Sequence, residues 1–351
     1  MNARHAGPRA DEPQQTGFPE VSVIMTVLNE SPHLRAAVER VLGQDYVGDL
    51  EVVVALGPSK DGTDSIAAEL ATGDDRVRTV GNPTGLTPAG LNAALAASKY
   101  EIVARVDGHA VIPRDYLRIA VETLEATGAD NVGGIMWAEG ETPFEEAVAR
   151  AMTTKLGVGN ARFHTGGEPG PADTVYLGVF RRSALERVGG YDEAFLRAQD
   201  WEMNYRIRRS GGLVWFEPRM RVSYRPRSTV RALARQYFHY GRWRRVVIRQ
   251  HRGSGNLRYL AAPLAVIAAA LGTLAGLLGV TIGPGWLAAG FLAPVGYLLG
   301  ILAGSALTGR GLPARAWAWL PLVYPTMHGA WGVGFLTSPP ALGRGAKSLQ
   351  R

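Results

Sequence analysis

The stretch Glu101-Ile-Val-Ala-Arg-Val-Asp-Gly-His-Ala-Val-Ile-Pro113 determines how the rest of the chain is interpreted. Its β-forming run, 102–106, ends abruptly in a carboxylate, a glycine and a histidine. This pattern predicts a buried strand that delivers Asp107 and His109 to the carboxyl edge of a sheet, with Gly108 letting the backbone turn. Because side chains alternate along an extended chain, Asp107 and His109 are expected on the same side.

This triplet has two interpretations. A carboxylate and an imidazole two residues apart can share one divalent cation, and such a cation can bind a diphosphate. Alternatively, Asp107 only ends the strand in a turn and His109 is solvated, because an Asp-x-His triplet alone is weak evidence. The surrounding sequence favours the functional interpretation.

Segments rich in β-formers alternate with amphipathic segments up to about residue 218. Strands are predicted at 21–28, 50–56, 77–80, 102–106, 131–136, 174–180 and 213–216. Helices are predicted between several of them, and this alternation indicates βαβ units with a mostly parallel sheet. The predicted fold class is therefore α/β.

Ligands of such sheets bind beyond the carboxyl ends of the strands. The polar residues that follow predicted strands are Asn29, Glu30, Ser59, Asp61, Asp107 and His109. We expect these side chains to converge on one site. The alternative is that polar loops always follow apolar strands, so that any one of these residues has no functional role.

Asp200 lies near the start of a helical pattern that is closed by Gly211-Gly212. As a helix cap, an aspartate contributes about 1 kcal/mol and nothing more. The functional interpretation is a general base, because a carboxylate held beside backbone amides and Trp201 keeps its position while a hydroxyl approaches.

The charges divide unevenly along the chain, which carries a net charge of +7. All 31 acidic residues lie at or before Glu217, whereas the last 134 residues contain 17 Lys and Arg and no acid. Such asymmetry points to an anionic surface, either a membrane or nucleic acid.

Three apolar runs, 260–280, 286–307 and 316–336, are each long enough to cross a bilayer as a helix. They exclude a soluble nucleic-acid binder and predict a multi-pass membrane protein. The third run contains Pro325 and His328, which leaves open whether it crosses completely.

The segment 219–259 holds 12 arginines between Arg219 and Arg258. It predicts a basic amphipathic helix on the membrane surface, although ordinary positive-inside topology explains most of these arginines equally well. The tail 1–19 is predicted to be disordered and does not resemble a signal peptide, so domain 20–218 is expected on the cytoplasmic side of the cell inner membrane. Residues 337–351 are predicted to form a basic tail. The sequence contains no cysteine.

Six short blocks between Val21 and Gly212 resemble the family 2 glycosyltransferases, an inverting group with the Rossmann-like GT-A fold. The blocks are 21–30, 59–63, 89–93, 105–109, 189–193 and 199–202. Within that family the chain is similar to membrane-attached enzymes of bacterial exopolysaccharide synthesis, of the succinoglycan glucosyltransferase type. The Asp-Gly-His triplet and the segments 237–242 and 327–332 carry this finer resemblance.

The resemblance implies a hexosyltransferase that uses a nucleotide-diphospho-sugar. Asn29, Glu30, Ser59 and Asp61 would line the nucleotide pocket. Asp107 would be the first acid of the metal-binding Asp-x-Asp motif, acting with Mn2+ or Mg2+, and Asp200 would be the catalytic base. Gln236, Arg242 and Trp243 would contact the acceptor or its lipid phosphate.

Four positions depart from the family pattern. Leu56-Gly57 stands where an acid usually contacts the nucleotide. His109 replaces the second acid of Asp-x-Asp, which favours a softer ion such as Mn2+. Gln199 replaces the acid that precedes the base. Gln236 and Arg242-Trp243 are spaced more widely than the signature of processive members, so processivity is not supported.

The expected reaction transfers a sugar to a hydroxyl of a lipid-linked acceptor in polysaccharide or glycolipid synthesis. One alternative is a polyprenyl-phosphate sugar synthase, whose phosphate acceptor needs no base. The other is a membrane protein that binds a nucleotide-sugar without catalysis.

Overall fold

The computed structural model describes residues 17–343. Most of the predicted disordered tail and the last eight residues of the predicted basic tail lie outside this range. Eight strands form one sheet in the order β3-β2-β1-β4-β7-β5-β8-β6. Their bounds are β1 (Val21–Val27), β2 (Leu50–Leu56), β3 (Val77–Gly81), β4 (Ile102–Arg105), β5 (Asn131–Ala138), β6 (Gly170–Pro171), β7 (Tyr176–Arg181) and β8 (Val214–Tyr224).

The sheet is mostly parallel, as predicted. β1 pairs in parallel with β2 and β4, β2 with β3, and β5 with β8. β7 runs antiparallel to β4 and β5, and β6 runs antiparallel to β8. β1 has almost no accessible surface from Val21 to Met25, which is why its sequence is apolar without strict alternation.

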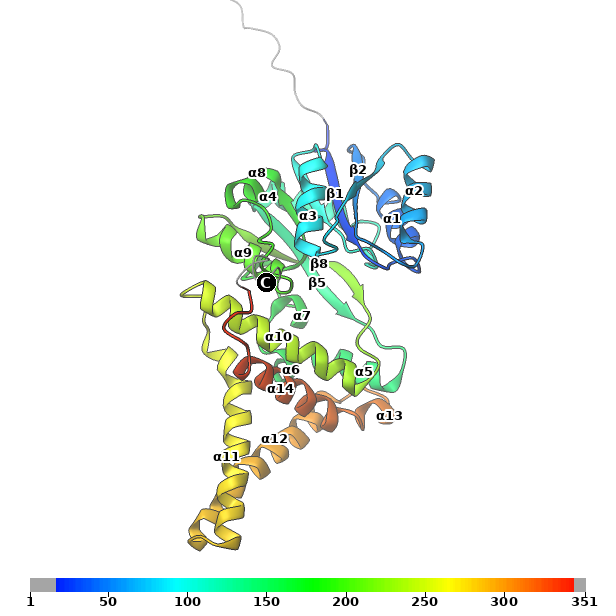
Figure 1. Cartoon of the computed structure of the whole chain (residues 1–351). Coiled ribbons are helices and arrows are strands. Elements are labelled where there is room, and N and C mark those ends of the chain that lie inside the picture. Colours follow the sequence, from blue (N-terminus) through cyan, green and yellow to red (C-terminus); the bar gives the residue numbers. More distant parts are fainter. Residues whose placement is uncertain (1–16, 344–351) are drawn as a thin grey trace, which may run out of the picture.

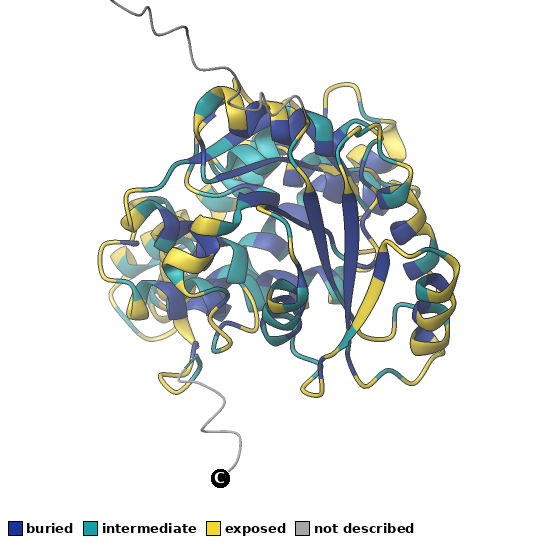
Figure 2. Cartoon of the chain, turned by 90° about the horizontal axis from the view of Figure 1, so that it is seen from above, coloured by how far each residue is buried: buried dark blue, intermediate teal, exposed yellow. Residues whose placement is uncertain are grey.

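Helices cover both faces of the sheet, and their inner faces are buried while their outer faces are exposed (Figure 2). The helices that contribute to the core on one face are α1 (Leu34–Leu42), α2 (Thr63–Gly73) and α4 (Tyr116–Thr127). Those on the other face are α3 (Thr87–Ala97), α8 (Arg182–Val188) and α9 (Gln199–Arg209).

The register of the parallel strands places three loops at one edge of the sheet. Val27, at the end of β1, pairs with Leu56 at the end of β2, and Ile24 pairs with Arg105 at the end of β4. The loops that follow these strands therefore meet at the carboxyl edge, which faces α10 (Val230–Gln250) (Figure 1).

The basic segment 219–259, for which a basic amphipathic helix was predicted, is helical only in part. Residues 219–224 continue β8, and the helix α10 begins only at Val230. α10 packs side by side with α14 (Leu320–Leu336) (Figure 1). Leu233 of α10 and Tyr324 of α14 belong to a buried cluster that also contains residues of α5 (Pro143–Met152). Arg245 stacks on Phe335 of α14, so part of the predicted basic amphipathic helix contacts protein.

Two apolar helical stretches are long enough to cross a membrane, Leu257–Thr281 and Gly285–Thr308. They contain α11 (Ala261–Thr281) and α12 (Leu292–Thr308), which project away from the sheet (Figure 1). Their side chains are largely exposed, as expected for a surface that lipid covers.

The third apolar run is not one long helix. It is divided between α13 (Ala314–Trp317) and the 17-residue α14. Leu320, Val323 and Met327 of α14 are fully buried against protein. His328 is bound on both ring nitrogens, to the Tyr297 hydroxyl of α12 and to the Leu156 carbonyl of α6 (Lys155–Val158). Hydropathy alone does not distinguish such a packed helix from a membrane span.

Candidate active site

The loops after β1 and β2 are joined by side chains that the sequence placed in the site. Asn29 has a left-handed backbone (φ 57°), which asparagine tolerates better than most residues. The backbone N–H of Asn29 donates to Ser59 Oγ (3.1 Å), and its side-chain Oδ1 accepts from the backbone N–H of Lys60 (2.8 Å). The Glu30 N–H donates to Thr63 Oγ1 at 2.8 Å. These bonds hold Asn29 and Glu30 at the rim.

Asp61 organises the same two loops. Its Oδ1 accepts from the hydroxyl (2.6 Å) and the N–H (3.2 Å) of Thr63, and its Oδ2 accepts from the Ser31 N–H (3.1 Å). The hydrogen bond from Thr63 is the main reason that the pKa of Asp61 falls to about 2. Asp61 therefore stays ionised at any physiological pH.

The loop after β4 passes very close to β1. A Cβ atom on Gly108 would lie 2.6 Å from Val27 Cγ1, so only glycine fits without a shift. This contact holds His109 beside Glu30, with its Nδ1 2.9 Å from Glu30 Oε1. That hydrogen bond raises the pKa of His109.

A cleft of about 280 Å³ opens at this rim. It is lined by Thr26, Val27, Leu28, Glu30, Gly85, Thr87, Arg105, Asp107, Gly108, His109 and Gln199. At Gly57, where the family pattern has an acid, the structure leaves little room for a side chain. A Cβ on Gly57 would lie 3.1 Å from the Val27 carbonyl and 3.2 Å from Gly85 Cα, so the backbone fills the place of the missing acid.

Arg105, the last residue of β4, joins the two carboxylates that the sequence singled out. Its Nε and Nη2 donate to Asp107 Oδ1 at 3.0 and 2.9 Å, and its Nη1 donates to Asp200 Oδ1. The Arg105 side chain is 5% exposed, whereas those of Asp107 and Asp200 remain 23% and 34% exposed. A buried guanidinium thus holds two carboxylates that face the same rim.

Asp200 sits in the first turn of α9 but does not cap it. The cap residue is Ala198, whose φ of 61° is unusual for alanine, and no side chain bonds the free amides. Burial raises the pKa of Asp200, Arg105 lowers it, and the charge of Asp107 raises it again, with a net upward shift. The amides of a helix N-terminus favour the ionised form. The capping interpretation is therefore replaced by an ion pair with Arg105.

The prediction from sequence missed the role of Arg105. The signal was present, because a charged residue in the buried run 102–106 needs a carboxylate partner. Tyr191 was missed as well. It is buried beside this pair, and its backbone is fixed by Asn92, which donates to the Tyr191 carbonyl and accepts from its N–H, both at 2.8 Å.

The two predicted metal ligands, Asp107 and His109, each keep one side-chain atom that can bind a cation. Arg105 binds Oδ1 of Asp107, which leaves Oδ2, and Glu30 binds Nδ1 of His109, which leaves Nε2. No cluster of three or more His, Cys, Asp or Glu side chains suited to a metal occurs within residues 17–343. This donor set fits a cation that completes its coordination with phosphate oxygens from a ligand, and does not fit a closed structural metal site.

The predicted acceptor residues lie on α10, outside the cleft at Asp107. Gln236 Nε2 donates to the hydroxyls of Tyr224 and Tyr240, each at 2.8 Å. Arg242 stacks over Phe238, with 5.5 Å between the guanidinium carbon and the ring centroid. Trp243 is buried against Phe195. The structure therefore gives Trp243 a packing role.

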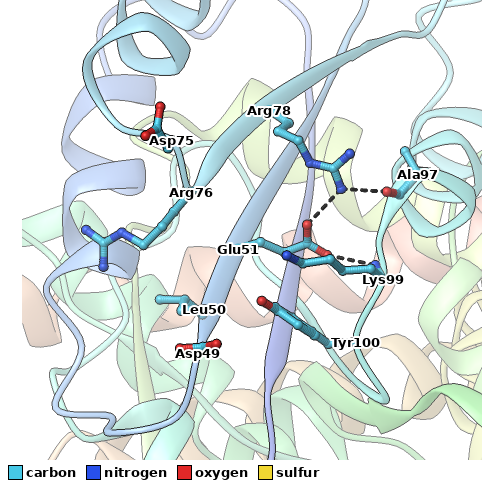
Figure 3. Close-up of a pocket in the computed structure, with 9 residues that line it drawn as sticks. All are labelled: Asp49, Leu50, Glu51, Asp75, Arg76, Arg78, Ala97, Lys99 and Tyr100. Carbon is cyan, nitrogen blue, oxygen red and sulfur yellow. Dashed lines mark hydrogen bonds and ion pairs between the residues drawn. The ribbon is translucent and has the colours of Figure 1, made fainter.

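A larger hollow of about 570 Å³ lies at the opposite, amino edge of the sheet (Figure 3). Its buried acid, Glu51, accepts from Arg78 (2.7 Å), the Ser22 hydroxyl (2.6 Å) and the Lys99 N–H (2.7 Å). Because three donors bind its two carboxylate oxygens, the buried Glu51 has a structural role in this hollow.

Comparison with known proteins finds relatives along most of the chain. Residues 22–189 match the family described as "Glycosyl transferase family 2". The chain is 34% identical over 319 residues to the succinoglycan biosynthesis protein ExoA of Rhizobium meliloti (strain 1021), covering 89% of this chain and 93% of that protein.

A more distant relative and a solved structure extend this comparison. The first is a Methanococcus voltae enzyme named dolichyl N-acetyl-alpha-D-glucosaminyl phosphate 3-beta-D-2,3-diacetamido-2,3-dideoxy-beta-D-glucuronosyltransferase. It is 24% identical over 249 residues, covering 68% of this chain and 77% of that enzyme. The second is a solved structure, the mannosyltransferase PcManGT from Pyrobaculum calidifontis in complex with GDP-Man and Mn2+. It superposes with a TM-score of 0.59 at 21% identity, covering 94% of this chain and 91% of that one, and it confirms the GT-A fold.

Proposed function

The chain belongs to glycosyl transferase family 2, and from this premise we propose an inverting transfer of a sugar from a nucleotide-diphospho-sugar to a hydroxyl of a lipid-linked acceptor. The observation that carries the proposal is the position of Arg105 between Asp107 and Asp200. A donor-side carboxylate and a base must face one rim for an in-line displacement, and one guanidinium holds both there.

Asp200 is the proposed base. Arg105 binds its Oδ1, so that Oδ2 is left to accept the proton of the acceptor hydroxyl as that oxygen attacks the anomeric carbon. The raised pKa of Asp200 makes it a stronger base than an ordinary aspartate. The leaving diphosphate departs from the opposite face of the anomeric carbon, on the side of Asp107.

Asp107 and His109 are the proposed ligands of a divalent cation. When bound, a cation such as Mn2+ or Mg2+ would supply positive charge to the diphosphate leaving group. Mn2+ accompanies GDP-Man in the structurally similar PcManGT, which supports this choice of ion and a nucleotide-sugar donor. Glu30 orients His109 through Nδ1, and Gly108 sets the path of the loop.

The lipid-linked acceptor is supported by two features. α11 and α12 are apolar and exposed, and α10 connects them to the carboxyl edge where Asp200 lies. The Methanococcus voltae relative carries a dolichyl phosphate acceptor in its name. We therefore place the protein in the cell inner membrane as a multi-pass protein, with residues 20–218 on the cytoplasmic side and the acceptor in the bilayer.

A donor screen tests this function. The full chain in lipid nanodiscs is incubated with nucleotide-sugars, Mn2+ or Mg2+ and a lipid extract, and the products are detected by mass spectrometry. We expect one glycolipid product whose anomeric configuration is opposite to that of the donor. A product with retained configuration would contradict the proposal, as would nucleotide-sugar binding without any turnover of donor.

A further inference from the structure

Four arginines lack an acidic partner: one lies in the loop before α9, one in the turn before α10 and two on α10 itself. Arg197, Arg227, Arg235 and Arg242 form no ion pair with any carboxylate among residues 17–343. The chain has no acidic residue after Glu217, so their neighbours along α10 cannot neutralise them. Four uncompensated guanidinium groups produce a strong positive field at this surface.

Packing between α10 and the loop before α9 brings these arginines together. Phe195 of that loop contacts Trp243 of α10, with ring centroids 6.2 Å apart, and it stacks on His251 at 5.9 Å. Burial lowers the pKa of His239, and Arg197, Arg242 and Arg235 lower it further. Their common effect on one imidazole places the three guanidinium groups within electrostatic range of His239.

Arg227 extends this cluster towards the cleft. Burial raises the pKa of Tyr240 to about 12, against the opposing charges of Arg227 and Arg197. The hydrogen bond to Glu30 raises the pKa of His109, and Arg227 lowers it. Arg227 therefore lies within electrostatic range of both His109, at the cleft, and Tyr240, on α10.

Buried polar atoms in this cluster remain without partners. Gln236 is 7% exposed, and its Oε1 has no hydrogen bond among the described residues. Its Nε2 donates to the Tyr224 and Tyr240 hydroxyls, so each hydroxyl keeps its own proton to donate. The buried Nε–H of Arg242 also lacks an acceptor within residues 17–343. Buried polar groups of native proteins are normally paired, so this set calls for a ligand.

We propose that Arg197, Arg227, Arg235 and Arg242 bind the phosphate or diphosphate headgroup of the lipid-linked acceptor. The guanidinium fork matches phosphate oxygens, and the tyrosine hydroxyls add donors. This inference rests on the proposed function and assigns it a substrate class: the acceptor is a phosphorylated lipid and not a neutral glycolipid.

The position of the cluster favours a lipid over the nucleotide as the source of the phosphate. The cleft at Asp107 is lined only by residues between Thr26 and Gln199, and α10 contributes nothing to it. α10 leads through the short turn Leu257–Leu260 directly into the apolar α11. When its headgroup binds to α10, the lipid can therefore place its hydrocarbon chain beside α11 and α12.

The test compares binding of farnesyl diphosphate, farnesol and pyrophosphate to the full chain in detergent, measured by thermophoresis. The variant is Arg197→Gln/Arg235→Gln, because both side chains are exposed and their loss leaves no cavity. The matched control is Arg231→Gln, an exposed arginine one turn earlier on the same helix. Binding of a nucleoside diphosphate with Mn2+ is measured in parallel, together with hydrolysis of the donor.

We expect wild type to bind farnesyl diphosphate more tightly than pyrophosphate and not to bind farnesol. The double variant should lose about tenfold in affinity for each arginine removed. The control variant should bind as wild type does, and nucleoside diphosphate binding should be unchanged in all variants.

Three results would overturn the inference. Farnesyl diphosphate could bind the double variant as tightly as wild type, pyrophosphate could bind wild type as tightly as farnesyl diphosphate, or the double variant could lose the nucleoside diphosphate instead. None of these three results counts against the proposed sugar transfer as long as the protein still hydrolyses the nucleotide-sugar donor. Conversely, farnesyl diphosphate binding without turnover of any nucleotide-sugar would count against the proposed function and leave this site standing.

Discussion

Asp107 and Asp200 lie far apart in the sequence, yet both bind the guanidinium group of Arg105. Because Arg105 is almost completely buried, the two acids meet at a fixed point on the carboxyl edge of the sheet. One of them faces the proposed diphosphate position and the other faces the proposed acceptor. Their common attachment links the geometry of donor binding to the geometry of the base.

Arg105→Gln removes the charge that neutralises both acids. Leaving two partly buried carboxylates without a cation should lower the free energy of unfolding by about 3 kcal/mol. We also expect kcat to fall, because Asp200 loses its fixed position. Thermal melting and steady-state kinetics of the full chain check both effects.

The matched control for this change is Arg118→Gln. Arg118 pairs with Glu122 one turn away on the exposed side of α4, where an ion pair contributes roughly 0.3–0.5 kcal/mol. Equal melting temperatures for the two variants would show that Arg105 does not hold the two acids.

Gly108→Ala should disturb the cation-binding loop. The new Cβ would lie 2.6 Å from Val27 Cγ1, so the loop must move away from β1 and carry Asp107 and His109 with it. We expect the concentration of Mn2+ needed for half-maximal activity to rise about tenfold, as for other losses of metal-site support. Metal titration of the transfer reaction measures this.

Gly73→Ala, at the end of α2, is the control for Gly108→Ala. A Cβ there meets nothing within 4 Å, and the metal dependence should stay that of wild type. A Gly108→Ala variant with the same metal titration as Gly73→Ala would argue against a cation at Asp107 and His109.

The raised pKa of Asp200 predicts the acid limb of the pH profile. The base acts only when ionised, so kcat should fall as the pH drops through a midpoint above 3.8, the ordinary aspartate value. In Arg105→Gln the lost positive charge should move this midpoint to higher pH. The profile is measured at saturating donor and cation, with circular dichroism confirming the fold at each pH. If the midpoint does not move in Arg105→Gln, ionisation of Asp200 does not control kcat.

The contact between α10 and α14 depends on glycine. A Cβ on Gly334 would lie 2.1 Å from the Phe238 carbonyl oxygen, so Gly334→Ala should force the helices apart and cost about 1–3 kcal/mol. Gly329→Ala on the same helix meets nothing within 4 Å and should be neutral or slightly stabilising. Melting temperatures in detergent compare the two variants, and equal values would contradict the close packing.

The sequence predicted the strands of the core well because their signal is local. β1 and β2 are buried on both faces, and each is a mainly apolar run in which apolar and polar residues do not alternate strictly. β8 was predicted only to Phe216. Pro218 follows, and proline normally ends a strand. The structure accommodates this proline where the pairing between β5 and β8 shifts register, and the strand continues to Tyr224.

The site was predicted in part. Asp107 and Asp200 could be found because each follows a recognisable local pattern, whereas the role of Arg105 depends on a partner from a distant helix. α14 resembled a membrane span because its residues are apolar in every direction. Only the tertiary structure shows that Leu320, Val323 and Met327 are buried by α10 and α5 instead of lipid.

The most direct test of the account is the activity of Asp200→Asn beside its affinity for nucleotide. We expect sugar transfer to fall at least about 100-fold, the usual range for loss of a general base. Nucleoside diphosphate binding with Mn2+ should stay within about twofold of wild type, since Asp107 and His109 are retained. Transfer at the wild-type rate would contradict the assignment of Asp200 as the base.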